Sequence, residues 1–243
     1  MKALNEIGLL LYPSIRGLMY LNAFIKNGVV PGVVVIQGAM PQGIFKNYTG
    51  DFWQRHSRYI DVNDFNDGIE DYLDSHGIES VQLSEASINS EALRKATLER
   101  PEQIFVFSGG GIVEQPLLDT RKRFIHIHPG ILPDYRGSTC YYYSMLKDGR
   151  CGASAFFMER ELDAGDLIGR KSFMSPSIDA VDWMFFDVIY DPWIRSELLY
   201  EIIRDYKNSG VFNAVPQDKD AGEMYFIIHP VLKHLAIKGR LRK

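Results

Sequence analysis

Phe124-Ile-His-Ile-His-Pro-Gly-Ile-Leu-Pro-Asp-Tyr-Arg-Gly137 is the stretch of this chain that decides its fold. It begins as a short apolar run typical of a buried strand, and its prolines and glycine then interrupt the strand. His126 and His128 are two residues apart, so both side chains point to the same face of an extended strand. The carboxyl ends of strands in α/β sheets are where such folds bind ligands, which makes both histidines candidate site residues.

The sequence before this stretch alternates between strand and helix patterns. Ile7–Tyr12 and Val29–Gln37 are continuous apolar runs, as expected of parallel strands buried on both faces. Between them, residues 17–26 carry apolar side chains at helical spacing, and Asn27-Gly28 ends that helix. Further strands are predicted over 78–83, 103–107, 152–159 and 167–173, and further helices over 90–99, 112–118 and 138–147. The chain is therefore predicted to have an α/β fold, with a Rossmann-like, mostly parallel sheet and helices on both faces.

The last third of the chain no longer alternates between strand and helix patterns. The strands predicted over 152–159 and 167–173 are joined by a tight turn, so they should form an antiparallel pair at the edge of the sheet. Residues 179–207 are predicted to form one or two amphipathic helices, with Pro192 as the point of interruption. We expect a domain over residues 1–174 and a small helical and irregular C-terminal extension over residues 175–243.

Composition excludes several classes of protein. The chain has 243 residues, 46% of them hydrophobic and 24% charged, which is typical of a globular protein. Its formal net charge of −4 argues against nucleic-acid binding, because phosphate contacts require clustered Lys and Arg. The two cysteines suggest no disulfide framework, and no apolar run is long enough to cross a membrane. We expect a cytoplasmic protein with neither a nucleic acid nor a membrane as its partner.

Two loops leave alternatives open. The first strand is followed by Pro13-Ser-Ile-Arg-Gly17 instead of GxGxxG, which disfavours a nicotinamide-dependent dehydrogenase. Ser14 in this turn either caps the following helix or faces an anionic ligand. Ser108-Gly-Gly-Gly111 follows the strand at 103–107 and is either a plain loop or a ligand wall made of main chain.

A carboxylate completes a candidate polar constellation. Asp163 lies in a glycine-containing turn after a strand, within Leu162-Asp-Ala-Gly-Asp-Leu-Ile168. With His126 to Gly137 and Gly152-Ala-Ser154, this pattern resembles the folate-dependent formyltransferases. Their motif is Asn-x-His-Pro-Ser-Leu-Leu-Pro-x-Tyr-Arg-Gly, followed by a strand that begins with glycine and by Leu-Asp-x-Gly-x-Ile. The order and spacing match over residues 103–174.

The resemblance implies a role for each matched residue. His128 corresponds to the catalytic histidine and Asp163 to the catalytic aspartate, whereas His126 occupies the position of an asparagine that polarises the formyl carbonyl. The implied formyl donor is 10-formyltetrahydrofolate, whose pterin ring is held largely by main chain between two loops. The implied cofactor-binding residues are Gly110, Gly111, Ile112, Val113, Glu159, Arg160, Glu161 and Leu162.

The histidine at position 126 leaves three alternatives for the chemistry. An imidazole can donate an N–H to the developing oxyanion as an amide does, but only in the right tautomer or when it is protonated. The chain is then an active N-formyltransferase. The second alternative is a family member with impaired catalysis that only binds a ligand. The third is a metal-dependent hydrolase in which His126, His128 and Asp163 are the three metal ligands.

Features that this sequence lacks narrow the range of possible acceptors of the formyl group. Initiator-tRNA formyltransferases add a C-terminal barrel, for which this chain ends too early, and glycinamide ribonucleotide enzymes begin with a Gly-rich phosphate loop. The expected arrangement, a core domain followed by a variable C-terminal extension, resembles that of the sugar N-formyltransferases. We expect a small amine acceptor such as a nucleotide-linked amino sugar, with amino-acid and peptide-precursor acceptors left open. The apolar segment Tyr225–Leu235 either pairs with a second copy in a homodimer or packs on its own core.

Overall fold

The computed structural model describes residues 1–39, 50–60, 69–176 and 183–239. The chain divides into two compact units, Met1–Ile125 (unit 1) and His126–Lys243 (unit 2). The elements of unit 1 are β1 (Lys2–Leu11), α1 (Ile15–Lys26), β2 (Val29–Gln37), α2 (Gly50–Arg55), α3 (Ile69–Ser75), β3 (Ser80–Leu83), α4 (Glu91–Glu99), β4 (Ile104–Phe107) and α5 (Gln115–Leu118). Strand β5 (Arg123–His128) carries the boundary between the units.

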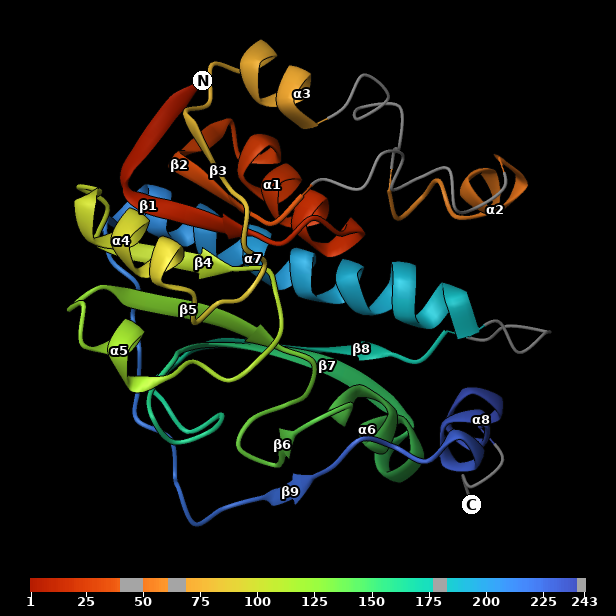
Figure 1. Cartoon of the computed structure of the whole chain (residues 1–243). Helices are drawn as coiled ribbons and strands as arrows, with labels where there is room; N and C mark the ends of the chain where they lie inside the picture. The colour runs from red at the N-terminus through yellow and green to blue at the C-terminus, as the bar shows by residue number, and fades with distance from the viewer. Residues whose placement is uncertain (40–49, 61–68, 177–182, 240–243) are drawn as a thin grey trace. The chain divides into compact units, whose positions relative to one another are not determined.

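Unit 2 contains the remaining elements, two of which form a small separate sheet. They are β6 (Tyr135–Gly137), α6 (Cys140–Asp148), β7 (Arg150–Phe157), β8 (Leu167–Met174), a π-helix (Phe185–Tyr190), α7 (Asp191–Ser209), β9 (Glu223–Tyr225) and α8 (Pro230–Lys238). Strands β6 and β9 pair in parallel and lie side by side in Figure 1. The described part of the C-terminal extension is therefore mainly helical and includes one short strand.

The main sheet confirms the predicted fold class. Its strand order is β3-β2-β1-β4-β5-β7-β8. Strands β1 and β2 pair in parallel, with Gly8 opposite Val33 and Leu11 opposite Ile36, and β1 also pairs in parallel with β4. The final pair, β7 and β8, is antiparallel, as the tight turn between them predicts. The chain thus has an α/β fold with a mostly parallel, mixed sheet.

The first helix begins at a side-chain cap. The Ser14 hydroxyl accepts a hydrogen bond from the Gly17 backbone N–H at 3.2 Å, which satisfies one of the unpaired donors of the first turn. Arg16 in the same turn donates from Nε to the Ser108 carbonyl at 2.6 Å. Of the two roles predicted for Ser14, the structure shows helix capping.

One predicted helix is shorter than its sequence pattern suggested. The pattern predicted a helix over 112–118, whereas α5 begins at Gln115. Glu114 has an extended backbone, and Pro116 stands in the first turn, where its fixed φ and missing N–H are tolerated. The side chain of Asn89 bonds to the backbone of Ile112 and Glu114, so tertiary contacts hold these residues out of the helix.

The helical run changes from a π-helix to an α-helix next to Pro192, the residue predicted as its point of interruption. The π-helix at Phe185–Tyr190 leads directly into α7, and Pro192 is the second residue of α7, where a missing N–H costs little. The C-terminal part of the predicted 179–207 helix is confirmed, and residues 179–182 lie outside the described residues.

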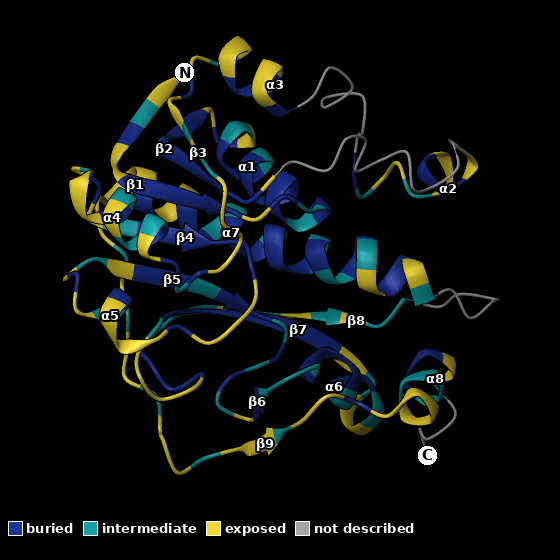
Figure 2. Ribbon diagram, viewed as in Figure 1, coloured by how far each residue is buried: buried dark blue, intermediate teal, exposed yellow. Residues whose placement is uncertain are grey.

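Burial differs sharply between the central strands and the C-terminal helix. Strands β1 and β2 are largely buried, whereas α8 carries exposed residues (Figure 2). Cys140 and Cys151 are both buried, and no disulfide joins them. Within the described ranges, no helix combines the length and apolar character needed to cross a bilayer.

The turn between β7 and β8 has no room for a side chain at Gly165. A Cβ at Gly165 would collide with the Phe157 backbone carbonyl, which cannot move without disturbing β7. We expect Gly165→Ala to lower the free energy of unfolding by about 2 kcal/mol, the usual cost of overpacking. The control is Gly169→Ala on β8, where a Cβ meets only side chains at 3.5 and 3.7 Å. Equal denaturation midpoints for the two variants would contradict this account.

Candidate active site

The orientation of the His128 ring is fixed by the motif that follows it. His128 ends β5 and is 2% exposed. Its Nε2 lies 2.8 Å from the backbone carbonyl of Tyr135, the first residue of β6. A carbonyl oxygen can only accept a hydrogen bond, so Nε2 must carry the hydrogen. In the neutral ring the lone pair is therefore on Nδ1.

The Nδ1 atom of His128 faces the carboxylate of Asp163. The distance from Nδ1 to Asp163 Oδ2 is 3.5 Å, and the aspartate is 6% exposed. The same Oδ2 accepts a hydrogen bond from the Gly137 backbone N–H at 2.8 Å. Asp163 has a φ of +54°, a left-handed conformation that Asp tolerates better than most residues. The structure thus brings two of the predicted site residues together.

Burial dominates the electrostatics of this pair. It lowers the pKa of His128, while the Asp163 charge opposes that shift and the Arg195 charge reinforces it. Arg195 on α7 is itself paired with Asp191, at 2.7 and 2.9 Å, and donates to the Ile127 carbonyl at 3.3 Å. A neutral imidazole with a bare Nδ1 can accept a proton, and the neighbouring carboxylate stabilises the imidazolium that forms.

The loop after His128 allows no side chain at Gly130. A Cβ there would lie 2.8 Å from Cys140 Cβ and 2.9 Å from His128 Nε2. The formyltransferase motif has serine at this position, so Gly130 is a second departure from it. The buried Ser154 hydroxyl on β7 donates to the Gly130 carbonyl at 2.7 Å and accepts from the Leu132 N–H at 2.9 Å. These bonds fasten the loop to β7.

His126 is the most accessible of the three predicted catalytic residues. It is half-buried, and its ring meets Phe156 edge-on at 5.9 Å between centroids. His126, His128 and Asp163 are all described, yet no group of three or more His, Cys, Asp or Glu among the described residues is arranged to hold a metal ion. The metal-dependent alternative therefore has no ligand set in this part of the chain.

The two loops predicted to bind the cofactor belong to different units. In unit 1, Gly110 and Gly111 are exposed and the Ile112 side chain is 64% exposed. In unit 2, Glu159–Leu162 is an exposed turn in which Leu162 is 39% exposed. Each loop thus presents an exposed apolar side chain, and the unit 1 loop also has exposed glycine backbone, whereas Val113 is buried. Their roles in binding stay predictions.

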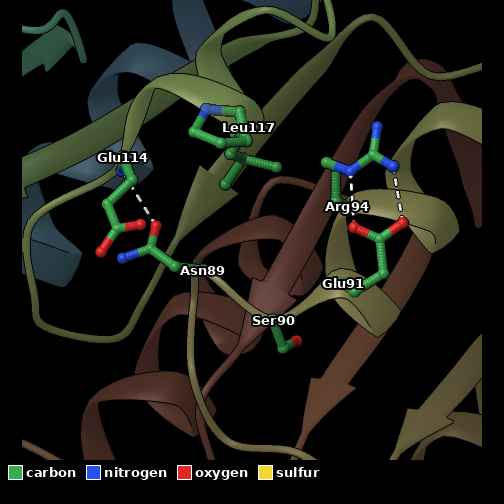
Figure 3. Close-up of a pocket in the computed structure, with 7 residues that line it drawn as sticks. Asn89, Ser90, Glu91, Arg94, Glu114 and Leu117 are labelled. Atoms are coloured by element: carbon green, nitrogen blue, oxygen red, sulfur yellow. Dashed lines mark hydrogen bonds and ion pairs between the residues drawn. The ribbon is translucent and has the colours of Figure 1, made fainter.

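Asn89 shapes the unit 1 loop, and sequence analysis did not identify this role. Its Nδ2 donates to the Ile112 carbonyl and its Oδ1 accepts from the Glu114 N–H, both at 2.9 Å. Asn89 also borders a cavity of about 160 Å³ (Figure 3). The cavity is lined by Asn89, Ser90, Glu91, Arg94, Glu114, Pro116 and Leu117. Of its three charged residues, Glu91 and Arg94 are paired with each other.

Sequence analysis also missed Arg195 and the bridging role of Ser154. Ser154 belongs to the quoted Gly152-Ala-Ser154 pattern, so its position carried a signal without an explanation. Arg195 carried a weaker signal, an Asp-Arg pair four residues apart on a predicted helix, which usually indicates a solvent-exposed face. Only the packing of α7 shows that Arg195 is buried and that its partner Asp191 is half-buried.

The lowered pKa of His128 makes a prediction about stability and pH. The unfolded chain binds a proton at His128 near pH 6.5, whereas the folded chain binds it only at lower pH. Stability should therefore be highest above about pH 6.5 and fall as the pH drops below it. In His128→Gln, which keeps a donor for the Tyr135 carbonyl, the decline in unfolding free energy between about pH 7 and 5 should be shallower. His234→Gln, at a partly exposed position on α8, is the control, and identical pH profiles for all three proteins would refute the explanation.

Comparisons with known proteins agree with this geometry. The sequence model described as "Formyl transferase" matches residues 66–179. A methionyl-tRNA formyltransferase from Levilactobacillus brevis is 29% identical over 147 residues, which is 60% of this chain and 45% of that protein. The chain thus spans less than half the length of this curated relative.

Solved structures show the same fold. An N-formyltransferase from Helicobacter canadensis, in complex with folinic acid and dTDP-3-aminofucose, aligns with a TM-score of 0.58 at 15% identity, over 97% of this chain and 80% of that one. Glycinamide ribonucleotide transformylase 1 from Symbiobacterium toebii aligns with a TM-score of 0.56 at 17% identity, over 90% and 95%. The resemblance seen in the sequence motifs is confirmed over residues 66–179, which match the formyl transferase family model.

Proposed function

We propose that this chain transfers a formyl group from 10-formyltetrahydrofolate to the amine of a small acceptor. The observation that carries the proposal is the buried pair of His128 and Asp163, with Nδ1 facing the carboxylate and Nε2 held by the Tyr135 carbonyl. Formyl transfer to an amine needs a base for the proton of the attacking nitrogen and a group that orders the base. This arrangement supplies both.

Each site residue has a task in the proposed reaction. His128 accepts the proton of the attacking amine at Nδ1, and Asp163 stabilises the resulting imidazolium. His126, the accessible imidazole, donates an N–H to the carbonyl oxygen that becomes negative. The bond from the formyl carbon to N10 of the folate breaks as the bond to the acceptor nitrogen forms, and the proton accepted by His128 passes to N10 of the departing tetrahydrofolate.

The proposed donor site uses the two loops around Ile112 and Leu162. We assign Gly110–Val113 and Glu159–Leu162 to the pterin ring, because exposed main-chain groups can hydrogen-bond its polar edge. The exposed Ile112 and Leu162 side chains suit an apolar ring face. The N-formyltransferase from Helicobacter canadensis was solved with folinic acid, which agrees with a folate site on this fold.

A nucleotide-linked amino sugar is the acceptor that we propose. The same solved structure contains dTDP-3-aminofucose, and this chain covers 80% of that protein. A homodimer is also proposed, because several apolar side chains of the 225–235 segment are exposed, including Phe226 at 78% and Ile227 at 80%.

The donor site is tested by binding of 5-formyltetrahydrofolate. Saturating ligand should raise the melting temperature, since a ligand at a hundred times its Kd stabilises a protein by about 2.7 kcal/mol. Ile112→Asn should weaken binding roughly tenfold, because it removes apolar contact area from the pterin. The control is Leu98→Asn, another exposed apolar position in unit 1. No stabilisation of the wild-type protein would refute the proposed function.

The acceptor is tested by measuring formyl transfer to a panel of amines. Nucleotide-linked amino sugars should be formylated, and Asp163→Asn should lower kcat by roughly 10²–10⁴, the usual contribution of acid–base catalysis. Turnover of glycinamide ribonucleotide or amino acids alone would overturn the proposed acceptor but not the donor. Folate binding without transfer, with activity appearing in His126→Asn, would instead favour a ligand-binding protein with impaired catalysis.

A further inference from the structure

Residues 215–222 form a segment that we name the C-terminal strap. The strap runs alongside residues 159–167, which we call the Asp163 turn. The strap lies between α7 and β9 in unit 2 (Figure 1). Val215 pairs with Leu167 in an antiparallel bridge, with N–H to carbonyl distances of 2.8 and 2.9 Å. At the other end of the turn, Lys219 Nζ forms ion pairs with Glu161 at 3.2 Å and Glu159 at 3.6 Å.

Gln217 contacts the centre of the turn. Its Nε2 donates to the Gly165 carbonyl at 2.5 Å and to the Asp163 carbonyl at 3.3 Å. Both neighbours are acceptors, so the amide nitrogen must face them. Its Oε1 is buried and has no hydrogen-bond partner among the described residues. In this environment the side chain acts only as a donor to the backbone beside the catalytic carboxylate.

The strap is also fastened to the motif that positions His128. Arg136, which is 7% exposed, donates to the carbonyls of Asp218 and Lys219 at 2.7 Å each. Gly222, with a φ of +82°, packs directly against the Pro133 carbonyl, where a side chain would not fit. The strap therefore joins the two segments that supply the histidine's anchor and the aspartate.

We propose that the C-terminal strap positions Asp163 for catalysis and that Gln217 is the positioning residue. This inference rests on the proposed function. Asp163 has a left-handed backbone, a conformation that persists where surrounding contacts impose it. The donor bonds from Gln217 to the carbonyls of Asp163 and Gly165 are such contacts. Without them the turn can relax and carry the carboxylate away from His128 and the Gly137 N–H.

The first test does not depend on enzymatic activity. The Gly137 amide donates to Asp163 Oδ2, so its hydrogen exchange reports whether the carboxylate is in place. In Gln217→Met, which has a similar length and no donor, exchange at Gly137 should accelerate roughly tenfold, the factor expected for a lost bond to a charged acceptor. The control is Gln82→Met, because Gln82 also donates to two carbonyls, those of Gly38 and Leu83. Unchanged exchange in a folded Gln217→Met protein would overturn the proposal.

Kinetics then separate positioning from a general loss of stability. Gln217→Met should lower kcat while the KM for the acceptor stays unchanged, since Gln217 is not expected to touch the acceptor. An unchanged kcat would refute a role in catalysis. If the wild-type protein transfers no formyl group but the exchange result holds, the proposed function fails and the positioning of Asp163 stands.

If Gln217→Met does not fold, a variant at an exposed position of the strap provides a second test. Lys219→Met removes the ion pairs to Glu159 and Glu161 at an exposed position. It should accelerate exchange of the Glu161 and Leu162 amides, because the strap would no longer hold that end of the turn. Wild-type exchange at these amides in Lys219→Met would show that the strap does not restrain the turn, and the proposal would fall.

Discussion

The hydrogen bond from His128 Nε2 to the Tyr135 carbonyl is the contact on which the site depends. It assigns the hydrogen to Nε2, and the lone pair of the neutral ring then lies on the side of Asp163. The chain must therefore return to the ring within seven residues after β5 ends. The missing side chain at Gly130 permits that return, and Ser154 fastens the loop to β7. Tyr135 is held in turn by the pairing of β6 with β9.

The charges around this bond are arranged so that a buried imidazole can act as a base. Burial lowers the pKa of His128, which keeps the ring neutral and able to accept a proton. A base in such surroundings needs a partner that stabilises its charged form, and Asp163 is placed to do so. The pairing of Arg195 with Asp191 leaves a cation close to β5 without an uncompensated buried charge. Burial and charge thus favour opposite states of the same ring.

The C-terminal part of the chain is more than an appendage to this site. Strand β9 pairs with the motif strand β6, and residues 215–222 contact both the motif and the Asp163 turn. The C-terminal region thus includes backbone and side chains that contact both segments of the candidate site. His126 is the point at which the chemistry departs from the family pattern. An imidazole there lies beside Phe156 and is the accessible member of the three.

The sequence alone predicted the fold class, the resemblance to the formyltransferases and the candidate pair of His128 and Asp163, because these depend on periodicity and on motifs with fixed spacing. It could not show the inward orientation of the His128 ring, the burial of Arg195, or the contacts of Asn89 and Gln217. Asn, Gln and Arg have similar local patterns whether they face solvent or bond to backbone groups. Only tertiary structure decides this, since their partners lie 23 to 68 residues away along the chain. Contacts distant in sequence also explain why α5 begins later than its apolar pattern predicted, because Asn89 bonds to the backbone of Ile112 and Glu114.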